Sequence, residues 1–324
     1  MAKPSEAVPR IVVLDGYPVN PGDNPWDELA SLGELEVFER SPPSSVFERA
    51  RHADILIVNK LRLGATQFDA LPRLRMVSVL ATGYDIIDLH AARQRGIVVC
   101  NVPEYGSAAV AEHTFALIFA LARHVERHHA SVRSGDWVRR EDFSYWCTPQ
   151  HELAGRCLGL IGVGRIGARV ARIANALDMQ VLAYDTNPDN RVQGVEWSSL
   201  EALLVRANIV SLHCPLTAQN QGLLDQHRFA LMKPGAWLIN TARAGLIEEN
   251  ALLEALNQGQ LGAAALDVQS CEPLPSEHPF LQTPKLLLTP HLAWSTHAAR
   301  QRLLAATVEN VRAFLQGAPI NVVS

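Results

Sequence analysis

The sequence has few of the features that mark secreted, membrane-bound or nucleic-acid-binding proteins. Its 5 cysteines are scattered over 324 residues with no CxxC pair, so a reducing, cytoplasmic location is expected. The first residues contain no apolar signal core. The most apolar stretch, 114–122, is too short to span a bilayer. A net charge of -4 offers no electrostatic attraction to nucleic acid or to an anionic membrane.

What remains is the composition of an ordinary folded protein. Hydrophobic residues make up 48% of the chain and charged residues 19%. A chain of 324 residues exceeds what one simple core accommodates, so two domains are expected.

Short apolar segments alternate with helical patterns along most of the chain. In the first hundred residues strands are predicted at 11–14, 35–38, 54–58, 74–80 and 97–100. A long helix at 104–123 follows, and a second series of strands is predicted at 158–161, 181–184, 209–213, 236–240, 263–268 and 286–289. Such alternation is typical of α/β domains with doubly wound parallel sheets. A final helix, 296–316, returns the chain to the first domain. We therefore expect one domain from 1–102 with 295–324 and another from 103–294.

Residues 124–152 interrupt this alternation. The segment is polar and rich in aromatic residues, which are Trp137, Phe143, Tyr145 and Trp146. So long a connection is unusual unless it serves a function. We interpret it as a dimerisation arm that reaches a second subunit; the alternative is a loop folded onto its own domain. His124, His128 and His129 are interpreted as a solvated helix face, not a metal site.

A glycine-rich turn, GVGRIG at 162–167, lies between an apolar strand and a predicted helix at 168–179. In a nucleotide-binding unit the first glycine makes the tight turn, the second lets backbone approach a pyrophosphate, and the third lets helix and strand pack closely. These positions are Gly162, Gly164 and Gly167. A structural glycine turn is the alternative, but the flanking strand and helix favour a dinucleotide site.

Asp185 follows the next strand, at the spacing at which a carboxylate binds the adenosine ribose diol. A carboxylate there repels a 2′-phosphate, and no arginine stands among the next residues, Thr186, Asn187 and Pro188. NAD is therefore expected as the cofactor in preference to NADP. The second domain is accordingly predicted to be a Rossmann NAD domain, and the first a flavodoxin-like substrate domain.

Polar residues follow three later strands of the second domain. They are Arg243, Glu272 and His291. Ligands of doubly wound sheets bind at the carboxyl ends of the strands, where these residues lie. For hydride transfer to a 2-oxo acid, the forked guanidinium of Arg243 suits the substrate carboxylate. His291 suits the proton donor to the developing alkoxide, and a neighbouring carboxylate, Glu272, favours the charged imidazole.

Each of the three also has an ordinary structural explanation. Arg243 can be a surface salt-bridge partner, His291 a hydrogen-bonded structural histidine, and Glu272 a loop acid before Pro273. Their combination at strand ends of a dinucleotide fold favours catalysis.

With these residues identified, the chain resembles the D-isomer-specific 2-hydroxyacid dehydrogenase family over essentially its whole length. The similar motifs are GVGRIG at 162–167, NTARAGL at 240–246 and TPHLAW at 289–294. The resemblance implies that Arg243 binds the substrate carboxylate and oxo group and that His291 is the acid/base. Glu272 would be its partner. Ala244 departs from the glycine usual in the family after the arginine, and activity is expected to survive this change.

The resemblance implies further site residues. The cofactor-binding residues would be Gly162, Gly164, Arg165, Ile166, Gly167, Asp185, Cys214, Pro215, Thr217, Thr241, Ala242 and Asp267. The loop Ala81, Thr82 and Gly83 would hold the substrate carboxylate through its amides. Lys60 either lines the substrate pocket or is an ordinary edge residue. Glu112 and His113 match the family's interdomain helix.

Within the family the sequence is most similar to glycerate dehydrogenases, also called hydroxypyruvate reductases. Supporting segments are 58–60, 142–146 and 293–302. The predicted function is NADH-dependent reduction of hydroxypyruvate, and of glyoxylate, to D-glycerate and glycolate, reversibly, in a homodimer. The alternatives are a D-2-hydroxyacid dehydrogenase of different substrate range and, from another class, an NAD-sensing scaffold similar to a corepressor.

Overall fold

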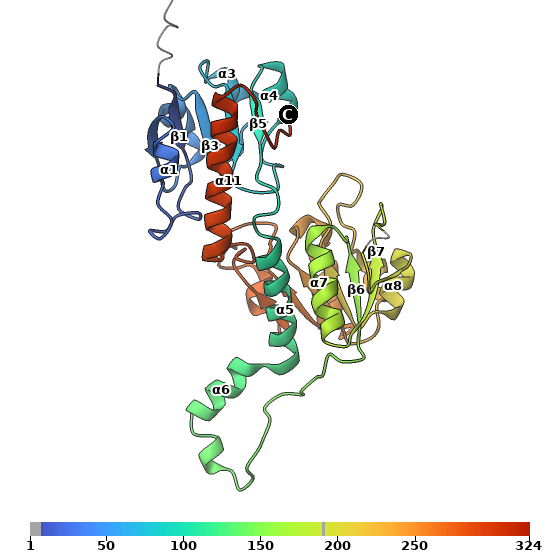
Figure 1. Ribbon diagram of the computed structural model, residues 1–324. Coiled ribbons are helices and arrows are strands. Elements are labelled where there is room, and N and C mark those ends of the chain that lie inside the picture. The colour runs from blue at the N-terminus through green and yellow to red at the C-terminus, as the bar shows by residue number, and fades with distance from the viewer. Residues whose placement is uncertain (1–7, 190–191) are drawn as a thin grey trace, which may run out of the picture. The chain divides into compact units, whose positions relative to one another are not determined.

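The computed structural model describes residues 8–189 and 192–324 (Figure 1). It divides into two compact units. One consists of the described residues up to Gly106 together with Trp294–Ser324, and the other is Ser107–Ala293. The chain therefore leaves the first unit and returns to it once, a few residues from the boundaries expected at 102 and 295.

The first unit contains a parallel sheet of 5 strands in the order β2-β1-β3-β4-β5. The strands are β1 (Arg10–Val13), β2 (Glu34–Val37), β3 (Ile55–Val58), β4 (Met76–Val79) and β5 (Val98–Cys100). β3 and β4 are buried along their whole length, which explains why their residues are apolar except for Ser78. This strand order is the flavodoxin-like one, so the predicted topology of the first domain is confirmed.

Helices cover both faces of this first sheet. They are α1 (Asp27–Ala30), α2 (Val46–Ala50), α3 (Ala65–Asp69), α4 (Leu89–Gln94) and α11 (His297–Leu315), with a 3-10 helix, η1 (Pro43–Ser45). Figure 1 shows α11 lying along the sheet. Leu303, Val308 and Val311 of α11 pack with Ile55, Ile57 and Met76 of the strands. Burial of each such side chain contributes about 2 kcal/mol. The C-terminal helix therefore completes the core of the first unit.

The second unit contains a parallel sheet of 7 strands in the order β12-β11-β10-β9-β6-β7-β8. The strands are β6 (Cys157–Ile161), β7 (Gln180–Tyr184), β8 (Glu196–Trp197), β9 (Ile209–Leu212), β10 (Ala236–Asn240), β11 (Leu261–Leu266) and β12 (Leu286–Leu288). The order reverses beside β6, as in the Rossmann fold, so the doubly wound prediction is confirmed.

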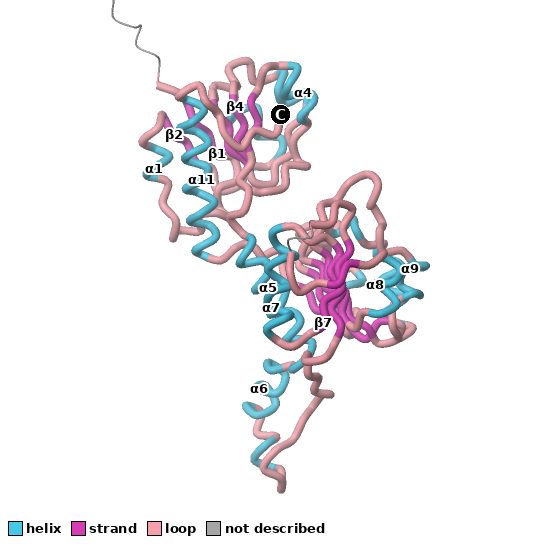
Figure 2. Tube along the Cα trace, turned by 45° about the vertical axis from the view of Figure 1, so that its right-hand side comes forward, coloured by secondary structure: helices cyan, strands magenta, loops and turns pink. Residues whose placement is uncertain are grey.

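The second sheet also has a core on each face. The helices are α5 (Ser107–Arg123), α6 (Val125–Arg133), α7 (Arg165–Ala176), α8 (Leu200–Arg206), α9 (Gln226–Leu231) and α10 (Glu249–Asn257), with the 3-10 helices η2 (Trp137–Arg139), η3 (Ala244–Leu246) and η4 (Pro279–Gln282). Figure 2 shows α5 and α7 on one side of the strands and α8 and α9 on the other. α5 and α7 bury their apolar residues in one core cluster, whereas α8, α9 and α10 bury theirs in the other.

Several predicted boundaries were wrong by a few residues. The long helix begins at Ser107, not at 104, because residues 101–106, which include Pro103, form an irregular connection. α7 begins at Arg165, immediately after the glycines, not at 168. The short strand β8 was missed, as two residues carry no recognisable pattern.

Residues 124–152 extend away from the rest of the second unit (Figure 1). α6 buries none of its residues. Hydrogen bonds join the segment to itself, as from Tyr145 Oη to Ser131 Oγ (3.0 Å) and from Cys147 N to His128 Nε2 (3.0 Å). His128 Nδ1 lies 2.9 Å from the His124 carbonyl. Both ring nitrogens of His128 therefore have protein partners.

In the part of the chain that the structure describes, no single helix is long and apolar enough to cross a membrane. α5 and α6 pass such a test only as a pair, and they bend by 54° at their junction. α5 itself buries Phe115, Leu117, Ile118 and Leu121 in the core of its own unit. Within residues 8–189 and 192–324, no three histidine, cysteine or carboxylate side chains are grouped as metal ligands.

Candidate active site

The candidate residues of the second unit stand in one row at the carboxyl edge of its sheet. The register pairs Ile161 with Tyr184 and Leu212, and pairs Asn240 with Leu212 and Leu266. Leu266 in turn pairs with Leu288. The residue after each strand therefore begins a loop at the same level. These residues are Gly162, Asp185, His213, Thr241, Asp267 and Thr289.

Gly162 makes a turn that no other residue fits. Its φ is +91°, and a Cβ atom there would lie 2.5 Å from the backbone nitrogen of Cys214. A Cβ on Gly167 would lie 2.3 Å from the Gly162 carbonyl oxygen. Both glycines are therefore required by packing of the strand, the helix and the loop after β9.

Gly164 is different, because a Cβ there would meet no atom within 4 Å. It caps α7, a helix of 12 residues whose first N–H groups point outward and attract negative charge. The open space at this helix N-terminus fits the pyrophosphate of a dinucleotide. Arg165 and Ile166 form the first turn of the same helix, as the motif predicts.

Asp185 lies at the end of β7, beside this turn. Its Oδ2 accepts a hydrogen bond from Val163 N (2.8 Å), and its Oδ1 accepts one from Asn187 N (2.9 Å). The carboxylate thus both braces the glycine turn and stands where the ribose of a dinucleotide on α7 would lie. Cys214, Pro215 and Thr217 lie on the loop after β9, and burial raises the pKa of the Cys214 thiol to about 11. That thiol is protonated at neutral pH and is not a nucleophile.

Arg243 lies on the loop after β10, and this loop is fixed by Asn240. The Asn240 side chain is fully buried; its Oδ1 accepts from Ala242 N (2.9 Å) and its Nδ2 donates to the Arg243 carbonyl (2.9 Å). The Arg243 guanidinium donates from Nη1 to the Ala242 carbonyl (2.8 Å). Ala244 begins a 3-10 turn and is not among the described residues with positive φ, so this position does not require glycine.

His291 and Glu272, predicted as a pair, are in direct contact. His291 Nδ1 lies 2.7 Å from Glu272 Oε2, and the second carboxylate oxygen of Glu272 accepts from Gln269 N (3.0 Å). Their side chains are 23% and 30% exposed, which leaves the pair reachable from solvent. This contact keeps a proton on Nδ1, which donates a hydrogen bond to the carboxylate oxygen.

Asp267, whose side chain is almost completely buried, holds the loop that carries His291. Its Oδ1 accepts from Thr289 Oγ1 (2.6 Å) and Leu292 N (2.9 Å), and its Oδ2 accepts from Ala293 N (2.9 Å). His291 itself has the left-handed φ of +53°. Such backbone is strained for a non-glycine residue and persists only where its surroundings fix it. The hydrogen bonds on both sides of His291 supply that constraint.

Two members of this network were not foreseen as site residues. Thr289 Oγ1 also lies 3.1 Å from His113 Nε2 on α5, and Gln269 Nε2 donates to the carbonyls of Leu266 and Thr289 (both 3.3 Å). Asn240 and Thr289 stand first in the motifs NTARAGL and TPHLAW, and His113 matches the family's interdomain helix, but a motif does not show which atoms meet. Asn240 and Gln269 contact backbone atoms and Thr289 contacts the side chains of Asp267 and His113, and these contacts depend on loop paths that a sequence does not specify.

The remaining candidates belong to the first unit. Lys60 follows β3, and Ala81, Thr82 and Gly83 follow β4 at the same edge of the first sheet. Thr82 Oγ1 donates to the Val102 carbonyl (2.9 Å). These residues and those of the second unit lie in separate compact units, each at a strand carboxyl edge.

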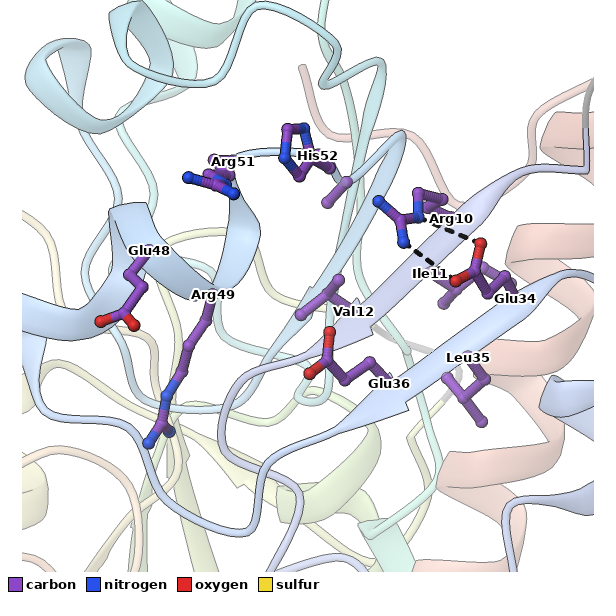
Figure 3. Close-up of a pocket in the computed structure, with 11 residues that line it drawn as sticks. Arg10, Ile11, Val12, Glu34, Leu35, Glu36, Glu48, Arg49, Arg51 and His52 are labelled. Carbon is purple, nitrogen blue, oxygen red and sulfur yellow. Dashed lines mark hydrogen bonds and ion pairs between the residues drawn. The ribbon is translucent and has the colours of Figure 1, made fainter.

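A surface pocket at the opposite, amino edge of the first sheet is not the candidate site (Figure 3). Arg10, which begins β1, and Glu34, which begins β2, form an ion pair of 2.9 Å there. Ligands of doubly wound sheets bind at the carboxyl ends, so the charged residues of this pocket are interpreted as surface structure.

Comparison with known proteins identifies the family of the chain. Residues 115–293 match the family model described as D-isomer specific 2-hydroxyacid dehydrogenase, NAD binding domain. The chain belongs to the D-isomer-specific 2-hydroxyacid dehydrogenase family. It is 40% identical to a hydroxypyruvate reductase of Blautia hydrogenotrophica, over 97% of this chain and 99% of that one. It is also 40% identical to a glycerate dehydrogenase of Methylorubrum extorquens, over 87% and 88%. The predicted family is confirmed.

Solved structures of the family are similar throughout. A D-lactate dehydrogenase of Aquifex aeolicus, complexed with NAD and lactic acid, has a TM-score of 0.83 at 29% identity and covers 95% of this chain and 96% of its own. An NADPH-dependent glyoxylate/hydroxypyruvate reductase of Sinorhizobium meliloti, in complex with NADP and malonate, has a TM-score of 0.85 at 28% identity, with 98% and 97% covered. Members of the family thus use either nicotinamide dinucleotide.

The glycine turn yields a prediction with an internal control. Gly162→Ala should lower the free energy of unfolding by about 3 kcal/mol, because the new Cβ meets backbone at positive φ. Gly164→Ala should leave the melting temperature unchanged, since its Cβ enters open space, but should weaken NADH binding about tenfold by obstructing the pyrophosphate. Thermal melts and fluorescence titration with NADH measure the two effects. Wild-type NADH affinity in Gly164→Ala would contradict the assignment of the α7 N-terminus.

Proposed function

We propose that the protein is an NADH-dependent reductase of hydroxypyruvate, and of glyoxylate, that also oxidises D-glycerate in the reverse direction. The contact of 2.7 Å between His291 Nδ1 and Glu272 Oε2, on a loop held by buried Asp267, carries the proposal. An imidazole held in this way is a proton donor for an oxo group. The names of the two 40% identical relatives support the choice of substrate.

The nicotinamide cofactor supplies the hydride. Arg243 binds the carboxylate of the substrate through its guanidinium fork and orients the oxo carbon. Its loop is held by the buried amide of Asn240, so the guanidinium is positioned before the substrate arrives.

His291 protonates the oxygen that gains negative charge as the hydride arrives. Because Glu272 holds the proton on Nδ1, the proton that is transferred comes from Nε2. Glu272 stabilises the imidazolium before transfer, and in D-glycerate oxidation the neutral ring accepts the hydroxyl proton. The hydrogen bonds of Asp267 fix the loop backbone that carries His291, and the contact with Glu272 orients the ring.

The remaining residues complete binding. Gly162, Gly164, Arg165, Ile166, Gly167, Asp185, Cys214, Pro215, Thr217, Thr241, Ala242 and Asp267 would surround the dinucleotide. The amides of Ala81, Thr82 and Gly83, together with Lys60, would hold the carboxylate end of the substrate from the first unit. NAD is preferred in this proposal because the Asp185 carboxylate at the ribose position repels a 2′-phosphate.

A second copy of the chain is the proposed partner of the 124–152 arm. Val138, Phe143 and Trp146 are 90%, 89% and 69% exposed, and α6 buries nothing on its own unit. Apolar side chains gathered on a projecting segment indicate a protein interface. We place the homodimer in the cytoplasm, since the scattered cysteines form no disulfides.

The direct test is NADH oxidation with a panel of oxo acids. Hydroxypyruvate should give the highest kcat/KM, glyoxylate should follow, and bulkier 2-oxo acids should be poorer. NADPH should be at least about tenfold less effective than NADH because of Asp185. A preference for a bulky 2-oxo acid would identify a D-2-hydroxyacid dehydrogenase of different substrate range. Absence of oxidation with every acid, despite NADH binding, would identify an NAD-sensing scaffold.

Glu272→Gln tests the acid/base pair. The amide keeps the shape of the Glu272 side chain but removes the negative charge beside His291 Nδ1. The alkaline limb of the pH profile for reduction should move downward. Glu277→Gln, an exposed acid on the same loop, is the control and should leave the profile unchanged. An unshifted profile in Glu272→Gln would remove Glu272 from the mechanism.

The arm is tested by sedimentation. The wild type should sediment at twice the chain mass of 35.5 kDa. Phe143→Glu should shift the protein to the monomer, because a charge is placed in an apolar interface. Val205→Glu on α8, 52% exposed and outside the arm, should leave the mass unchanged. A monomeric wild type, or a Phe143→Glu dimer of wild-type affinity, would exclude the arm as the interface.

A further inference from the structure

Asp15, the second residue after β1, binds the backbone of a different loop. Its Oδ1 accepts from Asn59 N (2.7 Å), and its Oδ2 accepts from Lys60 N (2.6 Å) and Leu61 N (3.2 Å). The pKa of this carboxyl is raised above its usual value because the group is buried. The backbone N–H donors and the Lys60 charge act in the opposite direction and reduce the shift. A carboxylate that accepts from successive amides fixes the path of that loop.

Asn59 extends this arrangement to the neighbouring strand. Its side chain is 5% exposed and donates from Nδ2 to the Leu80 carbonyl (2.8 Å). Leu80 N in turn donates to the Val58 carbonyl (2.7 Å). Because Leu80 precedes the loop of Ala81, Thr82 and Gly83, Asp15 and Asn59 together fasten the loops that follow β3 and β4.

These are the two loops of the first unit that contain the candidate substrate residues. Lys60 itself is exposed, but its backbone N–H donates a hydrogen bond to Asp15, and its neighbours Asn59 and Leu61 are buried. Backbone positions on both sides of an exposed side chain are therefore fixed, which limits where its ammonium group can reach.

We propose that Asp15 is a positioning residue for substrate binding, which acts by holding the Asn59–Leu61 loop so that Lys60 and the 81–83 amides meet the substrate carboxylate together. This inference rests on the proposed function, in which those groups bind a small oxo acid. Asp15 itself does not touch the substrate. Its carboxylate must be an acceptor on both oxygens, a condition that an amide of the same shape does not meet.

Asp15→Asn is the test variant, because its amide places a donor group against the backbone donors Lys60 N and Leu61 N. The KM for hydroxypyruvate should rise about tenfold or more, while kcat changes by less than about threefold. The dissociation constant of NADH should be unchanged, since the glycine turn lies in the other unit. Asp15→Glu keeps two acceptor oxygens, so its KM for hydroxypyruvate should lie between that of Asp15→Asn and that of the wild type.

Asp54→Asn is the matched control. Asp54 stands before β3, at the amino edge of the same sheet, and its Oδ2 also accepts a backbone hydrogen bond, from Arg10 N (2.9 Å). A loss of general stability in the first unit should affect both variants, but only Asp15→Asn should raise the KM. Equal effects on the KM in the two variants would show that Asp15 is merely structural and would overturn the proposal.

Amide hydrogen exchange separates this proposal from the proposed function. Without substrate, amides 59–61 and 81–83 should exchange about tenfold faster in Asp15→Asn than in the wild type, and at the wild-type rate in Asp54→Asn. Unchanged exchange in Asp15→Asn, or faster exchange with an unchanged KM, would refute the positioning role. If the wild type reduces no oxo acid while exchange is still faster in Asp15→Asn, the proposed function is refuted. The link between this loop and a substrate is then refuted with it.

Discussion

The carboxylate of Asp267 is the contact on which the candidate chemistry depends. It is buried, and its oxygens accept hydrogen bonds from Thr289 Oγ1, Leu292 N and Ala293 N. The same hydrogen bonds fix the backbone on both sides of His291, whose left-handed conformation needs such support. The buried Asp267 carboxylate thereby fixes the loop on which His291 contacts Glu272.

The same device recurs at other strand ends. Asn240 ends β10 and fixes the backbone of Ala242 and Arg243, Asp185 follows β7 and fixes Val163, and Asp15 fixes the Asn59–Leu61 loop after β3. In each case a polar side chain at the edge of a buried parallel sheet satisfies backbone groups of a loop. In the proposed function, a side chain that would meet a ligand is carried by a loop held in this way, which lowers the entropy cost of binding.

Much of the architecture was predictable because its signals are local. Apolar runs located the central strands, and the glycines at 162, 164 and 167 located the βα turn, since their spacing follows from backbone geometry. The contact of His291 with Glu272 was also predicted, from residues after neighbouring strands. The roles of Asn240 and Asp15 were not predicted, because their partners are backbone groups brought near only by the folded loops, and the contact of Thr289 with the Asp267 side chain depends on the same folding.

We propose above all that Arg243 and His291 act on one small oxo acid beside the nicotinamide. A crystal structure with NADH and oxamate, an analogue of a 2-oxo acid that is not reduced, tests it most directly. We expect the oxamate carboxylate to bind the Arg243 guanidinium and the oxamate amide oxygen to lie within hydrogen-bond distance of His291 Nε2. An oxamate bound away from either side chain, with the dinucleotide seated on α7, would contradict it.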